Sequence, residues 1–343
     1  MSSRRTFIKT SALAGAGLMT AGPLFGNYKD SVEKGLRVGV IGLDTSHSIA
    51  FAKSLNKEDA LPEFGGYKVV AAYPHGSTKI QSSMERIPEY TKEFRQMGVE
   101  IVDSIKGLLK KTDVILLETN DGNPHLEQAL QVFKSGKTVF IDKPVAGSLT
   151  DAFAIYQAAA DYKVPVFSAS SLRYISNMDD ILKDGSIGKV LGAEAYTPCY
   201  LEPSHPDLFW YGVHGVEPLI TVMGTGCKTV SRTQTKDTDF VVGVWNDGRI
   251  GTFRGLRSGK RDHGGFVFGE KDIKPLGTYN GYDPLLKEII KFFQTGKSSV
   301  TPEETLEIFT FMEAADESKR RGGAVVSLEE TKQKAIEKIK KSW

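Results

Sequence analysis

Residues 36–48 read Leu-Arg-Val-Gly-Val-Ile-Gly-Leu-Asp-Thr-Ser-His-Ser, and this stretch indicates the class of fold. Its first half is a short apolar run with β-branched residues that stops at Gly42, which is typical of a buried strand followed by a tight turn. Ile49, Ala52 and Leu55 then repeat at a spacing of three residues, which predicts a helix. The stretch therefore predicts a strand, a turn and a helix, which together form the first half of a βαβ unit.

The same alternation continues along the first half of the chain. Further strands are predicted at 68–72, 99–102, 113–119, 136–142 and 164–168, with helical patterns between them, including one at 148–162. Apolar strands separated by helices indicate a parallel sheet covered on both faces, so we expect an α/β Rossmann-type domain over 36–173. Ligands bind at the carboxyl ends of such strands. The segments expected there are 43–48, 73–77, 119–125 and 142–146.

The pattern changes near residue 192 to strands punctuated by glycine. These strands are predicted at 192–200, 229–235, 240–245, 249–256 and 265–268, with a hairpin turn at 246–248. Helices are predicted at 284–295 and at 302–321, the second beginning with the capping sequence Thr301-Pro302-Glu303-Glu304. Residues 174–330 are thus expected to form an α+β domain with a mostly antiparallel open sheet, followed by a solvated helical tail at 331–343.

The composition limits the kinds of partner. A chain of 343 residues is long enough for two domains, and 44 basic against 42 acidic residues leave no strongly basic surface for nucleic acid. Cys199 and Cys227 cannot form a disulfide framework, and neither belongs to the CxxC pair of a structural zinc site. The composition therefore argues against a nucleic-acid partner and against a structural zinc site.

The N-terminus carries a targeting pattern. Arg4 and Arg5 precede a weakly apolar stretch at 10–25 that is rich in Ala and Gly, which is typical of a twin-arginine export signal. This stretch is shorter than the about 20 residues that a membrane span needs. We expect residues 1–26 to be removed on export to the periplasm, leaving no stable membrane span. Because this route carries folded proteins, it also indicates a cofactor that is loaded before export.

Several motifs, taken in order, resemble the Gfo/Idh/MocA family, which includes relatives of glucose–fructose oxidoreductase and inositol dehydrogenase. They are the strand at 37–42, the turn at 119–125, the segment 136–144 with Asp-Lys-Pro in place of Glu-Lys-Pro, the segment 212–217 and the helices at 282–327. The resemblance covers about residues 36–330. It implies that the first domain binds NAD(P), that the second presents a sugar or cyclitol to the nicotinamide, and that the protein is a homo-oligomer, either a dimer or a tetramer.

The glycine fingerprint departs from the dinucleotide pattern. G-x-G-x-x-G reads Gly42-Leu-Asp-Thr-Ser-His47 here, so Asp44 brings a negative charge to the expected place of the diphosphate. Alternatively, Asp44 caps the free N–H groups of the following helix. No acid follows the second strand, whereas His75, Ser77 and Lys79 could meet a 2′-phosphate, which favours NADP over NAD. The predicted cofactor-binding residues are Gly42, Asp44, Thr45, Ser46, His47, His75, Thr119, Asn120, Asn123, His125 and Lys143.

Lys143 and His214 are the predicted catalytic pair. In the family the lysine contacts the nicotinamide and the substrate hydroxyl; pairing with Asp142 or a helix end is the alternative role of Lys143. His214 lies in a glycine-flanked turn, where a neutral imidazole could remove a hydroxyl proton, or it is a packed core histidine. The family's aspartate four residues before the histidine is Trp210 here. The predicted substrate contacts are Arg173, Trp210, Tyr211 and His214, with packing as the alternative for the two aromatic residues.

Histidines also gather at the predicted crevice. These histidines are His47, His75, His125, His205 and His214. Together with Asp44 they could bind a transition metal. Their spacing carries no local metal-ligand signature, so the sequence favours NAD(P) and we predict no metal ligand. Three functions stay open: an exported NAD(P)-dependent sugar or cyclitol oxidoreductase, a non-redox carbohydrate-active enzyme with or without a metal, and a carbohydrate-binding protein with a decayed nucleotide site. The first is the favoured interpretation.

Overall fold

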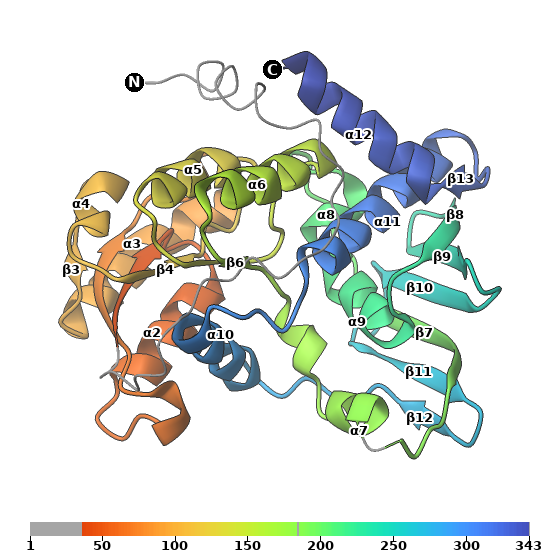
Figure 1. Ribbon diagram of the computed structural model, residues 1–343, viewed down its shortest axis with the longest axis horizontal. Coiled ribbons are helices and arrows are strands. Elements are labelled where there is room, and N and C mark those ends of the chain that lie inside the picture. Colours follow the sequence, from red (N-terminus) through yellow and green to blue (C-terminus); the bar gives the residue numbers. More distant parts are fainter. Residues whose placement is uncertain (1–35, 184, 343) are drawn as a thin grey trace.

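The protein is seen in a computed structural model, which describes residues 36–183 and 185–342. The predicted export signal at 1–26 lies outside the described residues. Two sheets organise the chain, one in each half of the sequence (Figure 1). The first has the order β3-β2-β1-β4-β5-β6, and all its neighbours are parallel. Its strands are β1 Arg37–Ile41, β2 Lys68–Tyr73, β3 Glu100–Ile101, β4 Val114–Leu117, β5 Val139–Ile141 and β6 Val166–Phe167.

This strand order confirms the predicted Rossmann-type domain. Alternate residues of β1 face opposite layers, because side chains alternate along a strand: Val38 and Val40 join the core that contains α2, whereas Ile41 joins the core that contains α5. The helices that connect these strands are α2 Ser46–Asn56, α3 Gln81–Gln96, α4 Ile105–Leu109, α5 His125–Lys134 and α6 Leu149–Tyr162. The order along the sheet reverses between β1 and β4, so the ligand crevice is expected at their carboxyl ends.

A helix from the last third of the chain completes the first core. α10 (Asp283–Thr295) buries Leu286 and Phe292 against the layer that contains Val38 and Phe140. From its place along the sequence, this helix is predicted to belong to the second domain, and that prediction is wrong. The local sequence pattern shows that the helix has an apolar face, but it does not show which sheet this face covers. The first domain therefore depends on a segment far from it in sequence.

The second sheet has the order β12-β11-β7-β10-β9-β8-β13. Its neighbours are antiparallel except for the parallel pair β7 and β10, which confirms a mostly antiparallel sheet. Its strands are β7 Val190–Pro198, β8 Cys227–Gln234, β9 Thr238–Trp245, β10 Ile250–Leu256, β11 Gly264–Gly269, β12 Ile273–Pro275 and β13 Val326–Ser327. The predicted turn at 246–248 joins β9 to β10 as expected.

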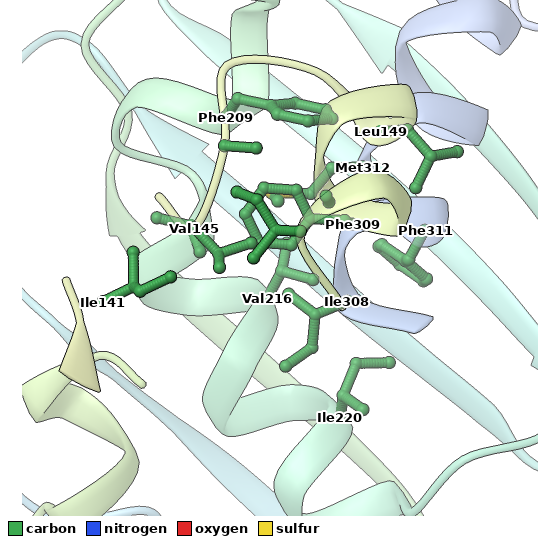
Figure 2. Close-up of a cluster of buried hydrophobic side chains, with 14 of the residues drawn as sticks. Ile141, Val145, Leu149, Phe209, Val216, Ile220, Ile308, Phe309, Phe311 and Met312 are labelled. Atoms are coloured by element: carbon green, nitrogen blue, oxygen red, sulfur yellow. The ribbon is translucent and has the colours of Figure 1, made fainter. Parts of the chain in front are cut away.

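Two helices fasten the halves of the molecule together. They are α9 (Val213–Met223) and α11 (Pro302–Arg320). Figure 2 shows their buried side chains gathered beside those of the first domain, namely Val216, Ile220, Ile308, Phe309 and Met312 beside Ile141, Val145 and Leu149. All of them belong to one hydrophobic cluster. Because α9 is packed into this shared core, the position of His214 in its first turn is fixed relative to the first sheet.

The remaining helices are short or terminal. They are α7 Met178–Lys183, α8 Asp207–Trp210 and α12 Leu328–Ser342. The predicted tail is helical, but α12 is docked on α6 and α11, with Thr331 and Ala335 buried, rather than solvated all round. Within the described ranges, no helix is both long and apolar enough to cross a membrane.

Shortening one side chain of α10 tests its part in the first core. Leu286 is fully buried, so Leu286→Ala should lower the free energy of unfolding by about 2–5 kcal/mol through lost contacts and a residual cavity. The matched control is Lys291→Ala on the exposed side of the same helix, which should change it by less than about 0.5 kcal/mol. Thermal melts of both variants provide the comparison. Equal melting temperatures would show that α10 is not part of the core.

Candidate active site

One cavity of about 370 Å³ lies where the loops of the first sheet meet α9. Residues 45–47 after β1, Asn120 after β4 and Lys143 after β5 line it from the first half, and His214 lines it from the second. These are the strand ends at which the sequence predicts a crevice. The volume is within the range of small-molecule sites, about 300–1,000 Å³.

Asp44 ties three loops together behind this cavity. Its carboxylate accepts hydrogen bonds from the backbone N–H groups of Ser77, at 2.9 Å, and Asn120, at 3.1 Å. Burial raises the pKa of this carboxyl group, and the two backbone bonds oppose the rise. A Cβ atom at Gly76 would lie 2.1 Å from the carboxylate, so the loop after β2 can close over Asp44 only with glycine at that position.

Thr45, and not Asp44, caps α2. Its Oγ1 accepts hydrogen bonds from the N–H groups of His47, at 2.9 Å, and Ser48, at 3.4 Å. The hypothesis that Asp44 caps its own helix is wrong, because its carboxylate faces the two neighbouring loops. Gly42 keeps the role of the first fingerprint glycine: its φ is +90°, and a Cβ there would lie 2.6 Å from the backbone of Thr119.

Lys143 and His214 line the same cavity, as the sequence predicts. His214 Nδ1 lies 2.7 Å from Ser170 Oγ, which holds the imidazole in place. Burial, together with the charges of Lys143 and His263, holds the pKa of His214 well below 6.5. The imidazole is therefore neutral at neutral pH, which is the protonation state that a base requires.

Aromatic side chains form much of the cavity wall. Trp210 and Tyr211 line it as predicted, and three further tyrosines join them, namely Tyr200, Tyr279 and Tyr282. The rings of Tyr200 and Tyr211 meet edge to face with centroids 5.1 Å apart. Such walls present apolar faces with polar hydroxyl tips, which suits a ring that carries hydroxyl groups. No periodic pattern marks these tyrosines, so the sequence did not single them out.

Other predicted residues support the loops instead of lining the cavity. Both ring nitrogens of His125 meet backbone carbonyls, those of Thr119 at 2.7 Å and Val145 at 3.2 Å. The amide of Asn123 donates to Asp121 at 2.8 Å. His125 and Asn123 are thus loop supports, and their side chains are already engaged.

Arg173 and His75 also lie elsewhere. Arg173 pairs with Glu304 at 2.6 Å and donates to Thr221 at 2.9 Å, and it is not among the cavity-lining residues, so its prediction as a substrate contact is not met. The His75 ring packs beside Tyr73, with centroids 5.2 Å apart.

The predicted histidine set does not converge on one metal position. His205 Nε2 lies 3.4 Å from Asp121, His125 bonds to backbone carbonyls, and His214 bonds to Ser170. Asp44 is held by backbone N–H groups and meets none of these imidazoles. His47 meets a carboxylate outside the predicted set, because its Nδ1 lies 2.9 Å from Asp142 Oδ1.

The cavity also has polar residues that the sequence did not indicate. Ser82 and Arg86 of α3 and His263 line it, and no motif marks them. Because Asp44 and Thr45 already accept from backbone N–H groups, a diphosphate would have to be met mainly by side chains. The hydroxyls of Ser46 and Ser82 and the guanidinium of Arg86 are suitable donors. These side-chain donors could therefore bind the phosphates of a nucleotide, in place of the backbone N–H groups that a glycine-rich loop usually offers.

Glu217 is a second buried acid near the site. Its Oε2 accepts from the N–H of Ser170 at 2.8 Å, whereas no described residue hydrogen-bonds its Oε1. Burial raises its pKa to about 8, although the charge of Arg173 opposes the rise. Glu217 thus lies directly behind the serine that holds His214.

Comparison with known proteins supports this architecture. Residues 36–170 match a family model described as an oxidoreductase family with an NAD-binding Rossmann fold. A 1,5-anhydro-D-fructose reductase from Ensifer adhaerens is 31% identical over 128 residues, which are 36% of this chain and 38% of that protein. The chain therefore matches less than half the length of this curated relative.

Solved structures extend the likeness to the second domain. A scyllo-inositol dehydrogenase from Lactobacillus casei, with bound NAD(H) and scyllo-inositol, has a TM-score of 0.68 at 13% identity, covering 86% of this chain and 100% of its own. A myo-inositol 2-dehydrogenase from Lactobacillus plantarum has a TM-score of 0.69 at 16% identity, covering 86% and 99%. At these identities the likeness establishes the fold.

The raised pKa of Glu217 predicts a pH-dependent stability. Its folded pKa of about 8 exceeds the ordinary 4.5, so its contribution is complete below pH 4.5 and is lost as the pH rises through about 8. Glu217→Gln mimics the protonated form and keeps an acceptor for Ser170. It should be more stable than the parent protein by over about 1 kcal/mol at about pH 8.5, with little difference at about pH 4.5. Thermal melts at both pH values measure this, with the exposed Glu303→Gln as control. A pH-independent difference would contradict it.

Proposed function

We propose that this protein is an NAD(P)-dependent oxidoreductase acting on a sugar or cyclitol hydroxyl or ketone, because residues 36–170 match the Gfo/Idh/MocA family model of NAD-binding oxidoreductases. The observation that carries the proposal is that Lys143 and a neutral His214 line one cavity at the carboxyl ends of the first sheet. Relatives named as a sugar reductase and as inositol dehydrogenases support this substrate class.

The bound nicotinamide would supply the hydride acceptor or donor. Ser46, Ser82 and Arg86 would hold its phosphates, since they are hydroxyl and cationic groups that line the cavity. Ser77 is engaged with Asp44 and Asp121, so His75 and Lys79 are the groups left to meet a 2′-phosphate. We keep NADP as the preferred cofactor on this basis, with NAD as the alternative.

Lys143 and His214 have different roles at the substrate oxygen. The Lys143 ammonium donates a hydrogen bond to this oxygen and stabilises the negative charge that develops on it as the proton leaves. His214 takes the proton during oxidation and returns it during reduction. Ser170 Oγ accepts from the N–H of Leu172 at 3.1 Å. It also accepts from Nδ1–H of His214 in the base-competent tautomer, which leaves Nε2 with the free electron pair.

Substitution of each member of the pair tests the assignment. Lys143→Ala and His214→Ala should each lower turnover by roughly 10²–10⁴, the loss typical of an acid–base group. In the parent protein, activity should stay level from about pH 8 down to about pH 6.5 and fall only below this, because the pKa of His214 lies well below 6.5. Formation of reduced cofactor at 340 nm with a panel of sugars and cyclitols measures both effects.

Lys106→Ala, an exposed substitution on α4, is the matched control and should keep full turnover. Melts must accompany the rates. If His214→Ala is folded and fully active, then His214 is not the base.

One observation favours a second function. Asp44 takes two loop N–H groups in the region where a phosphate is expected, which favours a non-redox carbohydrate-active enzyme on the same scaffold. Titration of the mature protein with NAD⁺, NADH, NADP⁺ and NADPH, followed by tryptophan fluorescence, separates the two. Micromolar binding of one of them supports the oxidoreductase. Absence of binding by all four would favour the non-redox enzyme.

We also propose that the protein is exported to the periplasm by the twin-arginine route and works there as a homo-oligomer. Support for export comes from Arg4 and Arg5, which lie outside the described residues. The double substitution Arg4→Lys and Arg5→Lys should keep the full-length protein in the cytoplasm, whereas Lys9→Arg should leave export intact. Cell fractionation with immunoblotting measures this. Equal periplasmic amounts of parent and double variant would contradict the proposal.

A further inference from the structure

Three side chains converge at the floor of the cavity, which His47 lines, and the proposed oxidoreductase chemistry does not require them. His47 lies in the first turn of α2, Glu118 directly follows β4, and Asp142 directly follows β5. One ligand atom from each lies within 4.8 Å of the others, and His47 Nδ1 is 2.9 Å from Asp142 Oδ1. β4 and β5 are neighbours in the sheet, which brings Glu118 and Asp142 together, and His47 at the start of α2 reaches Asp142.

The backbone holds these positions firmly. The N–H of Glu118 donates to the carbonyl of Ile41 at 2.7 Å, and the N–H of Asp142 donates to the carbonyl of Leu117 at 2.9 Å. The His47 ring packs on Tyr282, with centroids 4.5 Å apart. The three side chains are thus presented by a sheet edge and a helix end, which makes the cluster preorganised.

The cluster lacks a partner for its carboxylates. Both oxygens of Glu118 and one oxygen of Asp142 are buried without a hydrogen-bond partner among the described residues. Glu118 and Asp142 are both fully buried, and an unpaired carboxylate in such a place costs several kcal/mol. The charge of the nearby Lys143 can offset only one of the two negative charges. A divalent cation between the carboxylates would bind the open oxygens and neutralise both of their negative charges.

The donor atoms indicate which cation. One imidazole nitrogen with two carboxylates is a mixed N and O set, which suits a divalent transition metal such as Zn²⁺, Mn²⁺ or Fe²⁺ better than Ca²⁺ or Mg²⁺, which prefer oxygen ligands. His47 also lines the cavity, which gives an ion a route from solvent. We propose that His47, Glu118 and Asp142 bind one divalent transition-metal ion at the floor of the cavity.

Metal titration without cofactor or substrate tests this proposal, so its outcome is independent of the oxidoreductase assignment. Purified protein is freed of metal with a chelator and titrated with Co²⁺ followed by its visible absorption, and with Zn²⁺ in a calorimeter. We expect one equivalent to bind per chain and to raise the melting temperature. If neither Co²⁺ nor Zn²⁺ binds at near-millimolar concentration, the proposal is overturned, and the two carboxylates then share only a proton.

Two variants locate the ion. Glu118→Gln removes one ligand charge while keeping its shape, so the metal-free variant should fold and its affinity should fall by at least about 100-fold. Should this variant fail to fold, His47→Gln, which removes the nitrogen ligand at the edge of the cluster, should show the same loss. Glu217→Gln is the matched control, because it neutralises a buried glutamate outside the cluster, and it should bind metal like the parent. Unchanged affinity in a folded Glu118→Gln or His47→Gln variant, or loss in Glu217→Gln, would contradict this site.

Discussion

A buried carboxylate holds the ligand-binding end of the first sheet in shape. Asp44 accepts hydrogen bonds from Ser77 and Asn120, and so joins the loops after β1, β2 and β4 into one unit. Gly76 is required because its missing side chain makes room for the carboxylate. This arrangement affects the proposed cofactor binding. Asp44 occupies backbone N–H groups close to the expected place of a diphosphate, so side-chain hydroxyl and guanidinium groups must bind the diphosphate instead.

The shared core sets the other half of the site. α9 and α11 bury apolar side chains beside those of β5 and α6 (Figure 2). This packing fixes α9 so that His214 lines the same cavity as Lys143. Burial and the neighbouring positive charge keep the imidazole neutral, and Ser170 fixes one of its nitrogens. The packing of the two halves therefore also keeps His214 neutral, because it buries the imidazole.

Much of the fold was predictable, because it rests on local patterns. Apolar runs ending in glycine marked β1 and its turn, and the chain order of strands and helices was enough for a parallel sheet. The placement of α10 on the first sheet was not predictable, since its apolar face has no local mark of its partner. For the site, position at a strand end located Lys143, and a motif located His214. Arg86, Tyr279 and Glu118 were missed, because only the folded chain brings them to the cavity or its floor.

The proposed chemistry requires a nicotinamide nucleotide in this cavity with its reactive ring beside Lys143 and His214. A crystal structure of the mature protein soaked with NADP⁺ or NAD⁺ would show whether the nucleotide binds there. We expect the nicotinamide to lie against Lys143 and His214, the phosphates to contact Ser46, Ser82 or Arg86, and Asp44 to keep its bonds to Ser77 and Asn120. A nucleotide bound elsewhere on the molecule, or one that enters only by displacing Asp44 from these bonds, would contradict this expectation.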